Sequence, residues 1–203
     1  FMPSTIKDYA IDFDNDGNPD LYCANFGRDS PPYNMEDSFF IYNDYNSSGY
    51  YTQKVNPHVN FGHNASSGDI DKDGDLDCVV MNENEFYGYD PISFFEKYRD
   101  KSVLMANSSH LYEQIDGKFT NITEKAGLLS PTFGLGLCIS DINNDSWPDI
   151  YIANDYYVKD AMYINNQDGT FSNKIKESTK QISFYGMGVD IEDINRDNLN
   201  DIF

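Results

Sequence analysis

The sequence predicts an all-β fold of the β-propeller type, and a repeated acidic motif is the main reason. The pattern D-x-[DN]-x-D-[GSN]-x-x-D occurs four times, at residues 12–20, 69–77, 141–149 and 193–201. An aromatic-Gly pair begins eight residues before each of the last three copies, and an Asn lies thirteen residues after the start of each of the first three. Markers held in register indicate an internal repeat, and repeats of about 60 residues with strand-like runs are typical of propeller blades.

Each repeat unit is predicted to contain four short strands. The first follows the aromatic-Gly pair, the acidic loop turns the chain into an apolar second strand, and an Asp-Gly turn joins the third strand to an outer one, because Asp-Gly is a strong hairpin signal. The expected first strands follow residues 62, 134 and 186, the second strands are 20–25, 77–82 and 149–154, the third are 40–43, 111–112 and 162–165, and the outer strands begin near 119 and 171.

The spacing of the loops predicts one domain over residues 1–203, with an insertion. Successive loops start 57, 72 and 52 residues apart, and the longest interval holds extra residues at about 83–107. Asp90 and Pro91 there have the pattern of an N-cap followed by Pro at the first helical position, which predicts a short helix. With three to four blades in the chain, we expect a segment of a larger propeller; a closed four-bladed propeller is the alternative.

The four loops are candidate Ca²⁺ sites. Positions 1, 3, 5 and 9 supply side-chain oxygens and position 7 supplies a backbone carbonyl, and an all-oxygen set without Cys or His suits a hard cation. The spacing differs from that of an EF-hand, which needs a Glu at position 12. The candidate ligands are Asp12, Asp14, Asp16, Asn18 and Asp20 in the first loop; Asp69, Asp71, Asp73, Asp75 and Asp77 in the second; Asp141, Asn143, Asp145, Trp147 and Asp149 in the third; and Asp193, Asn195, Asp197, Leu199 and Asp201 in the fourth.

Position 6 of each loop needs a sharp turn with positive φ, which predicts stronger sites in the first two loops than in the others. Gly17 and Gly74 adopt that conformation without steric cost, Asn198 tolerates it, and Ser146 does so less readily. The alternative, that the loops are only polar turns, is less favoured because clustered carboxylates repel one another unless a cation neutralises them.

Composition excludes several classes of protein. The net charge of −20 disfavours nucleic-acid binding, and the sequence contains no apolar run long enough to span a membrane. The three cysteines, at 23, 78 and 138, lie in strand-like runs and are expected to be buried free thiols, with one disulfide as the alternative. We find no catalytic signature and expect a protein that is not an enzyme.

Aromatic residues of the insertion are the candidates for an exposed binding platform: Phe86, Tyr87, Tyr89, Phe94, Phe95 and Tyr98. Such platforms suit sugar or protein ligands. We favour the alternative that these rings pack the insertion onto the blades.

The acidic loops and their flanks resemble the FG-GAP/VCBS repeat family. Four stretches are most similar to its ASPIC/UnbV branch, which includes cartilage acidic protein-like chains: 111–127, 133–136, 145–154 and 187–190. The resemblance implies an extracellular or cell-surface propeller of about seven blades, with structural Ca²⁺ in up to four loops and a role in adhesion or in binding a protein or carbohydrate ligand. The alternatives are the propeller part of a polysaccharide-active enzyme such as a lyase, and a structural module of a larger chain or surface assembly.

Overall fold

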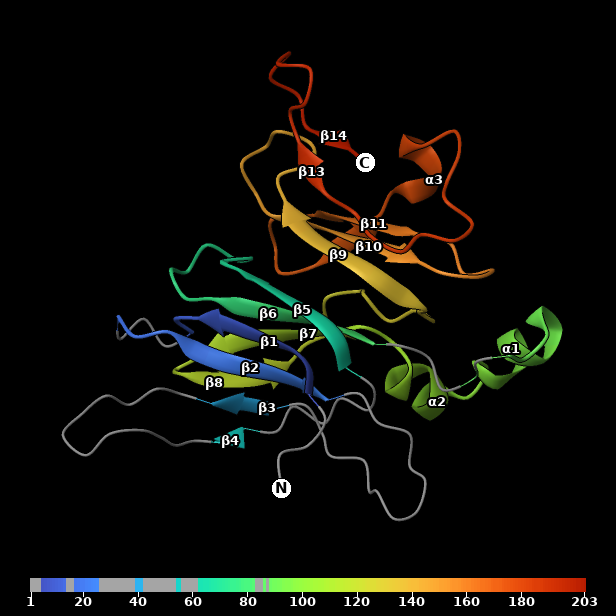
Figure 1. Ribbon diagram of the computed structural model, residues 1–203, viewed down its shortest axis with the longest axis horizontal. Helices are drawn as coiled ribbons and strands as arrows, with labels where there is room; N and C mark the ends of the chain where they lie inside the picture. Colours follow the sequence, from blue (N-terminus) through green and yellow to red (C-terminus); the bar gives the residue numbers. More distant parts are fainter. Residues whose placement is uncertain are drawn as a thin grey trace.

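Figure 1 shows a computed structural model of the chain, which describes residues 5–13, 17–25, 39–41, 54–55, 62–82, 86 and 88–203. In these ranges the fold is mostly β, with three four-stranded antiparallel sheets and a two-stranded hairpin. The described part of the chain has no helix with the length and apolarity needed to cross a membrane.

The strands of each sheet follow one another in chain order, as expected for propeller blades. The first sheet contains β1 (Thr5–Ile11), β2 (Asp20–Asn25), β3 (Phe39–Ile41) and β4 (Lys54–Val55). The second contains β5 (Gly62–Gly68), β6 (Asp77–Asn82), β7 (His110–Ile115) and β8 (Lys118–Asn121). The third contains β9 (Gly134–Ser140), β10 (Asp149–Asn154), β11 (Ala161–Asn165) and β12 (Phe171–Asn173), and the hairpin contains β13 (Ile191–Glu192) and β14 (Asp201–Ile202).

The predicted strand order is confirmed in the second and third units, and two predicted lengths are wrong. The third strand of the second unit covers 110–115 instead of 111–112, because it pairs with β6 on one side and β8 on the other. The first strand of the fourth unit does not begin after Gly186. It is limited to Ile191–Glu192, the two residues that pair with β14.

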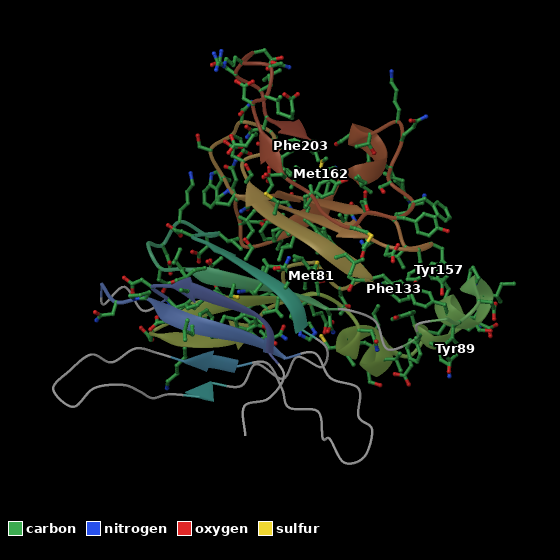
Figure 2. All side chains as sticks on the ribbon, in the orientation of Figure 1. Met81, Tyr89, Phe133, Tyr157, Met162 and Phe203 are labelled. Atoms are coloured by element: carbon green, nitrogen blue, oxygen red, sulfur yellow. The ribbon has the colours of Figure 1, made fainter. Side chains whose placement is uncertain are left out.

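The sheets stack face to face in chain order, with the hairpin beyond the third sheet (Figure 1). Apolar side chains fill the spaces between them. All six residues of β6 and all six of β10 are buried, because each second strand has a sheet neighbour on both faces. One core cluster joins the second and third sheets through Val79, Leu111 and Ile150, and Met81 lies in the same space (Figure 2).

Three short helices lie at the end of the sheets opposite the acidic loops (Figure 1). The predicted helix of the insertion is present as α1 (Pro91–Lys97), and the Asp90 carboxylate accepts hydrogen bonds from the backbone N–H groups of Ile92 and Ser93. A second helix in the insertion, α2 (Lys101–Ala106), was not predicted; Asp100 caps it in the same way. The third helix, α3 (Ile175–Ser178), follows β12.

Candidate metal centre

The ninth residue of every acidic loop is a carboxylate that closes the loop through the backbone. One oxygen accepts a hydrogen bond from the N–H of the second loop residue. These bonds run from Phe13 to Asp20 (2.8 Å), Ile70 to Asp77 (3.0 Å), Ile142 to Asp149 (2.9 Å) and Ile194 to Asp201 (3.1 Å). Because the same bond recurs in all four loops, the ninth carboxylate has a structural role whether or not it also binds a cation.

In the second and third units the other oxygen of this carboxylate holds the third strand. Asp77 Oδ1 accepts a bond from the backbone N–H of Gln114 at 3.0 Å, and Asp149 Oδ1 accepts one from that of Asn165 at 2.8 Å. Both carboxylates are buried. A buried carboxylate with two backbone donors ties the loop to two strands of its own sheet.

The second loop has the strongest features of a cation site. Carboxylate oxygens of Asp69, Asp71 and Asp73 all lie within 4.8 Å of one another, and this is the only such acidic group among the residues that the structure describes. Asp69 Oδ1 and Asp75 Oδ1 are buried oxygens without a hydrogen-bond partner. A buried acceptor left unpaired costs about 1–3 kcal/mol, and more if it is charged. The oxygens of this loop therefore fit a hard cation such as Ca²⁺.

Crowding and burial in this loop raise the pKa values of its carboxyl groups. Desolvation, followed by repulsion from Asp73, raises the pKa of Asp75 to about 6. Desolvation raises the pKa of Asp77 to about 7, although two backbone donors oppose the rise. The pKa of Asp71 is also raised, chiefly by desolvation. Without a cation, the folded loop therefore takes up protons more readily than isolated carboxylates do.

In the third and fourth loops the first carboxylate accepts a hydrogen bond from the backbone of the sixth residue. Asp141 Oδ2 accepts a bond from the N–H of Ser146 at 2.7 Å, and Asp193 Oδ2 accepts one from that of Asn198 at 2.9 Å. In the third loop the side-chain amide of Asn143 donates to Asp145 Oδ2 at 3.0 Å. An amide can satisfy a neighbouring carboxylate, whereas an ionised Asp at the same position can only accept. The Asn143 amide thus reduces the need for a cation in the third loop.

The first loop is described only in part. Asp12 Oδ2 accepts a hydrogen bond from the N–H of Gly17 at 2.9 Å, the same contact as in the third and fourth loops. The candidate ligands Asp14 and Asp16 lie outside the described residues.

Position 6 has positive φ in all four loops, as predicted: 90° at Gly17, 99° at Gly74, 72° at Ser146 and 66° at Asn198. Position 4 is also left-handed in three loops, at Lys72, Asn144 and Arg196, which the sequence did not indicate.

Neighbouring loops contact one another. The ammonium group of Lys72, in the second loop, lies 4.8 Å from the ring centroid of Trp147 in the third. Gln167, in the turn between β11 and β12, donates to Asp145 Oδ2 at 3.1 Å, and Asn200 donates to the carbonyl of Asp141 at 2.6 Å. Hydrogen bonds from Trp147 and Asn143 hold the pKa of Asp145 below its usual value, with a smaller contribution from Lys72. Gln167 and Lys72 were not identified from the sequence, because the first contact depends on pairing within the third sheet and the second on packing between units.

The aromatic insertion packs mainly onto the third sheet. Phe94 is buried and stacks on Phe133, with centroids 5.0 Å apart and planes 21° apart. Tyr157 contacts both rings, and its hydroxyl donates to the carbonyl of Tyr89 at 2.7 Å (Figure 2). Phe95 and Tyr89 remain partly exposed, and Tyr87 lies outside the described residues. The interpretation of these rings as packing contacts is thus confirmed for Phe94.

Two of the three cysteines are described with their side chains, and both are free thiols. Cys78 is buried, as predicted, whereas Cys138 is only half-buried. His110 is buried, and its Nε2 lies 2.8 Å from the carbonyl of Met105.

Stacked four-stranded antiparallel sheets, each with an acidic loop between its first two strands, define a β-rich repeat protein with candidate cation-binding turns. The chain belongs to the FG-GAP-like repeat family, which matches residues 12–80 and 141–203. FG-GAP repeats often bind Ca²⁺ and are typical of extracellular β-propeller domains that bind ligands or mediate adhesion. A comparison with curated proteins finds no match for this chain.

Proposed function

We propose that the chain is part of an extracellular, calcium-stabilised β-propeller that binds a ligand and does not catalyse a reaction. The observation that carries the proposal is the second loop, where three carboxylates converge and Asp69 Oδ1 is buried without a partner. Membership of the FG-GAP-like repeat family supports the extracellular and ligand-binding parts of the proposal. The sequence resemblance to the ASPIC/UnbV branch favours a propeller of more blades than this chain contains.

In this proposal Ca²⁺ supplies positive charge that offsets the repulsion among the carboxylates of each loop. Asp69, Asp71 and Asp73 would hold the ion in the second loop, and the corresponding residues would hold it in the other three. The ninth carboxylates keep their backbone hydrogen bonds, because each carboxylate oxygen has two lone pairs and can accept from more than one direction. Cation binding and loop closure therefore support each other.

The ligand is expected at the end of the sheets opposite the acidic loops. The acidic loops connect first to second strands, whereas the connections from second to third strands, including the insertion, lie at the other end. A rigid β scaffold with variable loops at one end is a common arrangement for binding sites. We propose that a protein or carbohydrate partner binds these connections.

Chelation tests the calcium proposal. EDTA should lower the melting temperature and excess Ca²⁺ should restore it, since saturation at a hundred times Kd is worth about 2.7 kcal/mol for each independent site. The variant Asp73→Ala should bind one ion fewer in a calorimetric titration. The control Glu177→Ala, which removes an exposed carboxylate of α3 outside the loops, should keep the full number. An identical melting temperature with and without EDTA would disprove structural calcium.

A further inference from the structure

A small basic pocket lies at the end of the third sheet away from the acidic loops. It has a volume of about 220 Å³, and Lys159, Lys176 and Lys180 line it together with Ile175, Gln181 and Ile182. Lys159 belongs to the connection between β10 and β11, and the other two lysines belong to α3 and the segment after it. Three of the 14 basic residues of a strongly acidic chain thus converge on one pocket.

The three lysines are exposed, and no carboxylate neutralises them among the described residues. The ion pairs in those ranges are Lys101 with Glu124 and Lys125 with Glu113, and neither involves a lysine of the pocket. An ammonium group without an ionic partner is free to bind an anion.

One buried carboxylate lies next to a lysine of the pocket in the sequence. Asp160 follows Lys159 directly, and its two oxygens accept bonds from the Tyr151 hydroxyl at 3.1 Å and the Asn154 N–H at 2.8 Å. Glu177, in α3, is the exposed acid that remains close in sequence. With three lysines against these two acidic residues, the pocket retains an excess of positive charge.

The negative charge of the acidic loops lies too far away to cancel this excess. The six residues of β10 separate Asp149, in the third loop, from Asn154 near the pocket. At about 3.3 Å per residue the strand spans roughly 20 Å. The Debye length is about 8 Å at physiological salt, so the loop charges are largely screened at the pocket.

Two exposed aromatic rings follow the pocket-lining residues in the segment after α3. Phe184 and Tyr185, shortly after Ile182, are 63% and 65% exposed. The ring of Tyr185 lies 6.4 Å from that of Tyr156, three residues before Lys159. Exposed rings present flat apolar faces that suit the C–H faces of sugars. Residues 155–160 and 179–187 therefore combine cationic and aromatic groups on one surface.

We propose that this surface binds an acidic glycan. The lysine-lined pocket takes a carboxylate or sulfate group, and the rings of Phe184 and Tyr185 contact the adjoining sugar. At about 220 Å³ the pocket accepts one anionic group and not a whole ligand, which fits a polymer with a charge on each repeating unit. The inference deepens the proposed ligand-binding function and rests on it.

Titration calorimetry tests this inference with heparin and an oligogalacturonate as probes, in 150 mM salt with excess Ca²⁺. At least one of the two should bind, and neutral dextran should not. The triple variant Lys159→Gln/Lys176→Gln/Lys180→Gln should weaken binding about tenfold or more, because three charge contacts are lost. The matched control Lys101→Gln/Lys118→Gln/Lys125→Gln, with the same change in net charge, should stay within about twofold. Phe184→Ala/Tyr185→Ala should also weaken binding.

Three outcomes would overturn the inference. The first is that neither acidic glycan binds the folded, calcium-loaded protein. The second is that the two lysine triple variants bind equally well, which would assign binding to net charge or to calcium bridging at the loops. The third is that poly-glutamate binds as tightly as the glycans and binds the Phe184→Ala/Tyr185→Ala variant with unchanged affinity. That result would indicate an acidic protein partner. Melting with and without EDTA on the same samples separates failure of this inference from failure of the calcium proposal.

Discussion

The side-chain amide of Asn165 donates a hydrogen bond to the backbone carbonyl of Ile70, 2.9 Å away and 95 residues earlier in the chain. Asn165 lies in the third sheet, and Ile70 is the second residue of the acidic loop of the second sheet. Gln114, in the second sheet, makes the matching contact at 2.6 Å to the carbonyl of Phe13 in the first loop. Each unit thus holds the acidic loop of the unit before it.

Substitution of Asn165 should therefore destabilise the stack. The variant Asn165→Leu removes donors to Ile70 and Pro148, whose carbonyl also accepts from this amide, and buried acceptors would be left unpaired. We expect a loss of about 3 kcal/mol in unfolding free energy, measured by urea denaturation. The exposed neighbour variant Asn166→Leu should cost less than about 1 kcal/mol. Equal losses for the two variants would contradict the inter-unit role of Asn165.

The raised pKa values in the second loop predict how pH changes the stability of the metal-free protein. Asp75 and Asp77 have folded-state pKa values of about 6 and 7, above the value of 3.8 for an unperturbed Asp. The folded state thus binds protons on Asp75 and Asp77 more tightly than the unfolded state does. The stability that comes from this tighter proton binding is fully present below pH 3.8 and is lost as the pH rises to about 7.

In EDTA, the melting temperature should therefore fall between pH 5 and pH 7.5 because of these groups. With excess Ca²⁺ the fall should shrink or reverse, since the cation binds the deprotonated carboxylates. The variant Asp75→Asn should flatten the EDTA profile, whereas Glu177→Gln should leave it unchanged. A profile in EDTA that Asp75→Asn does not alter would refute the assignment.

Trp147 should report on the third loop separately from the second. It is the single Trp of the chain, and its backbone N–H donates to Asp145 Oδ1 at 2.8 Å. Calcium titration should change its fluorescence, and Asp145→Ala should abolish the change. Asp73→Ala, in the second loop, should preserve it with a similar midpoint. Loss of the signal in Asp73→Ala would instead mean that the two loops bind as one site.

Relief of backbone strain at Ser146 should stabilise the protein. Its φ of 72° is unfavourable for a residue with a Cβ, whereas glycine adopts it freely. We expect Ser146→Gly to add about 0.5–1 kcal/mol to the unfolding free energy, measured by thermal melting. The control Ser183→Gly, at a residue without positive φ, should not stabilise. Gly74→Ala should destabilise despite the open space around that glycine, since its φ is 99°.

Much of the local structure could be predicted from the sequence. The acidic loops, the apolar second strands, the Asp-Gly turns and the Asp90 cap depend on residues close together in the chain, so composition and spacing suffice to locate them. The left-handed conformation at Ser146 also followed from its place in the repeat. The short β13 and the helix α2 were missed, because strand pairing limits the first and because the second has no periodic apolar pattern of its own.

The sequence by itself determined the class of fold, the four loops and the residue types that could bind a cation. Only the tertiary structure decided how those residues are used. It showed that the ninth Asp holds backbone N–H groups, that Asp69, Asp71 and Asp73 converge, and that Gln114 and Asn165 reach the preceding loop. It also brought Lys159 beside Lys176 and Lys180. The physical reason is that these contacts join residues on different strands and sheets, so they exist only once the sheets pair and stack.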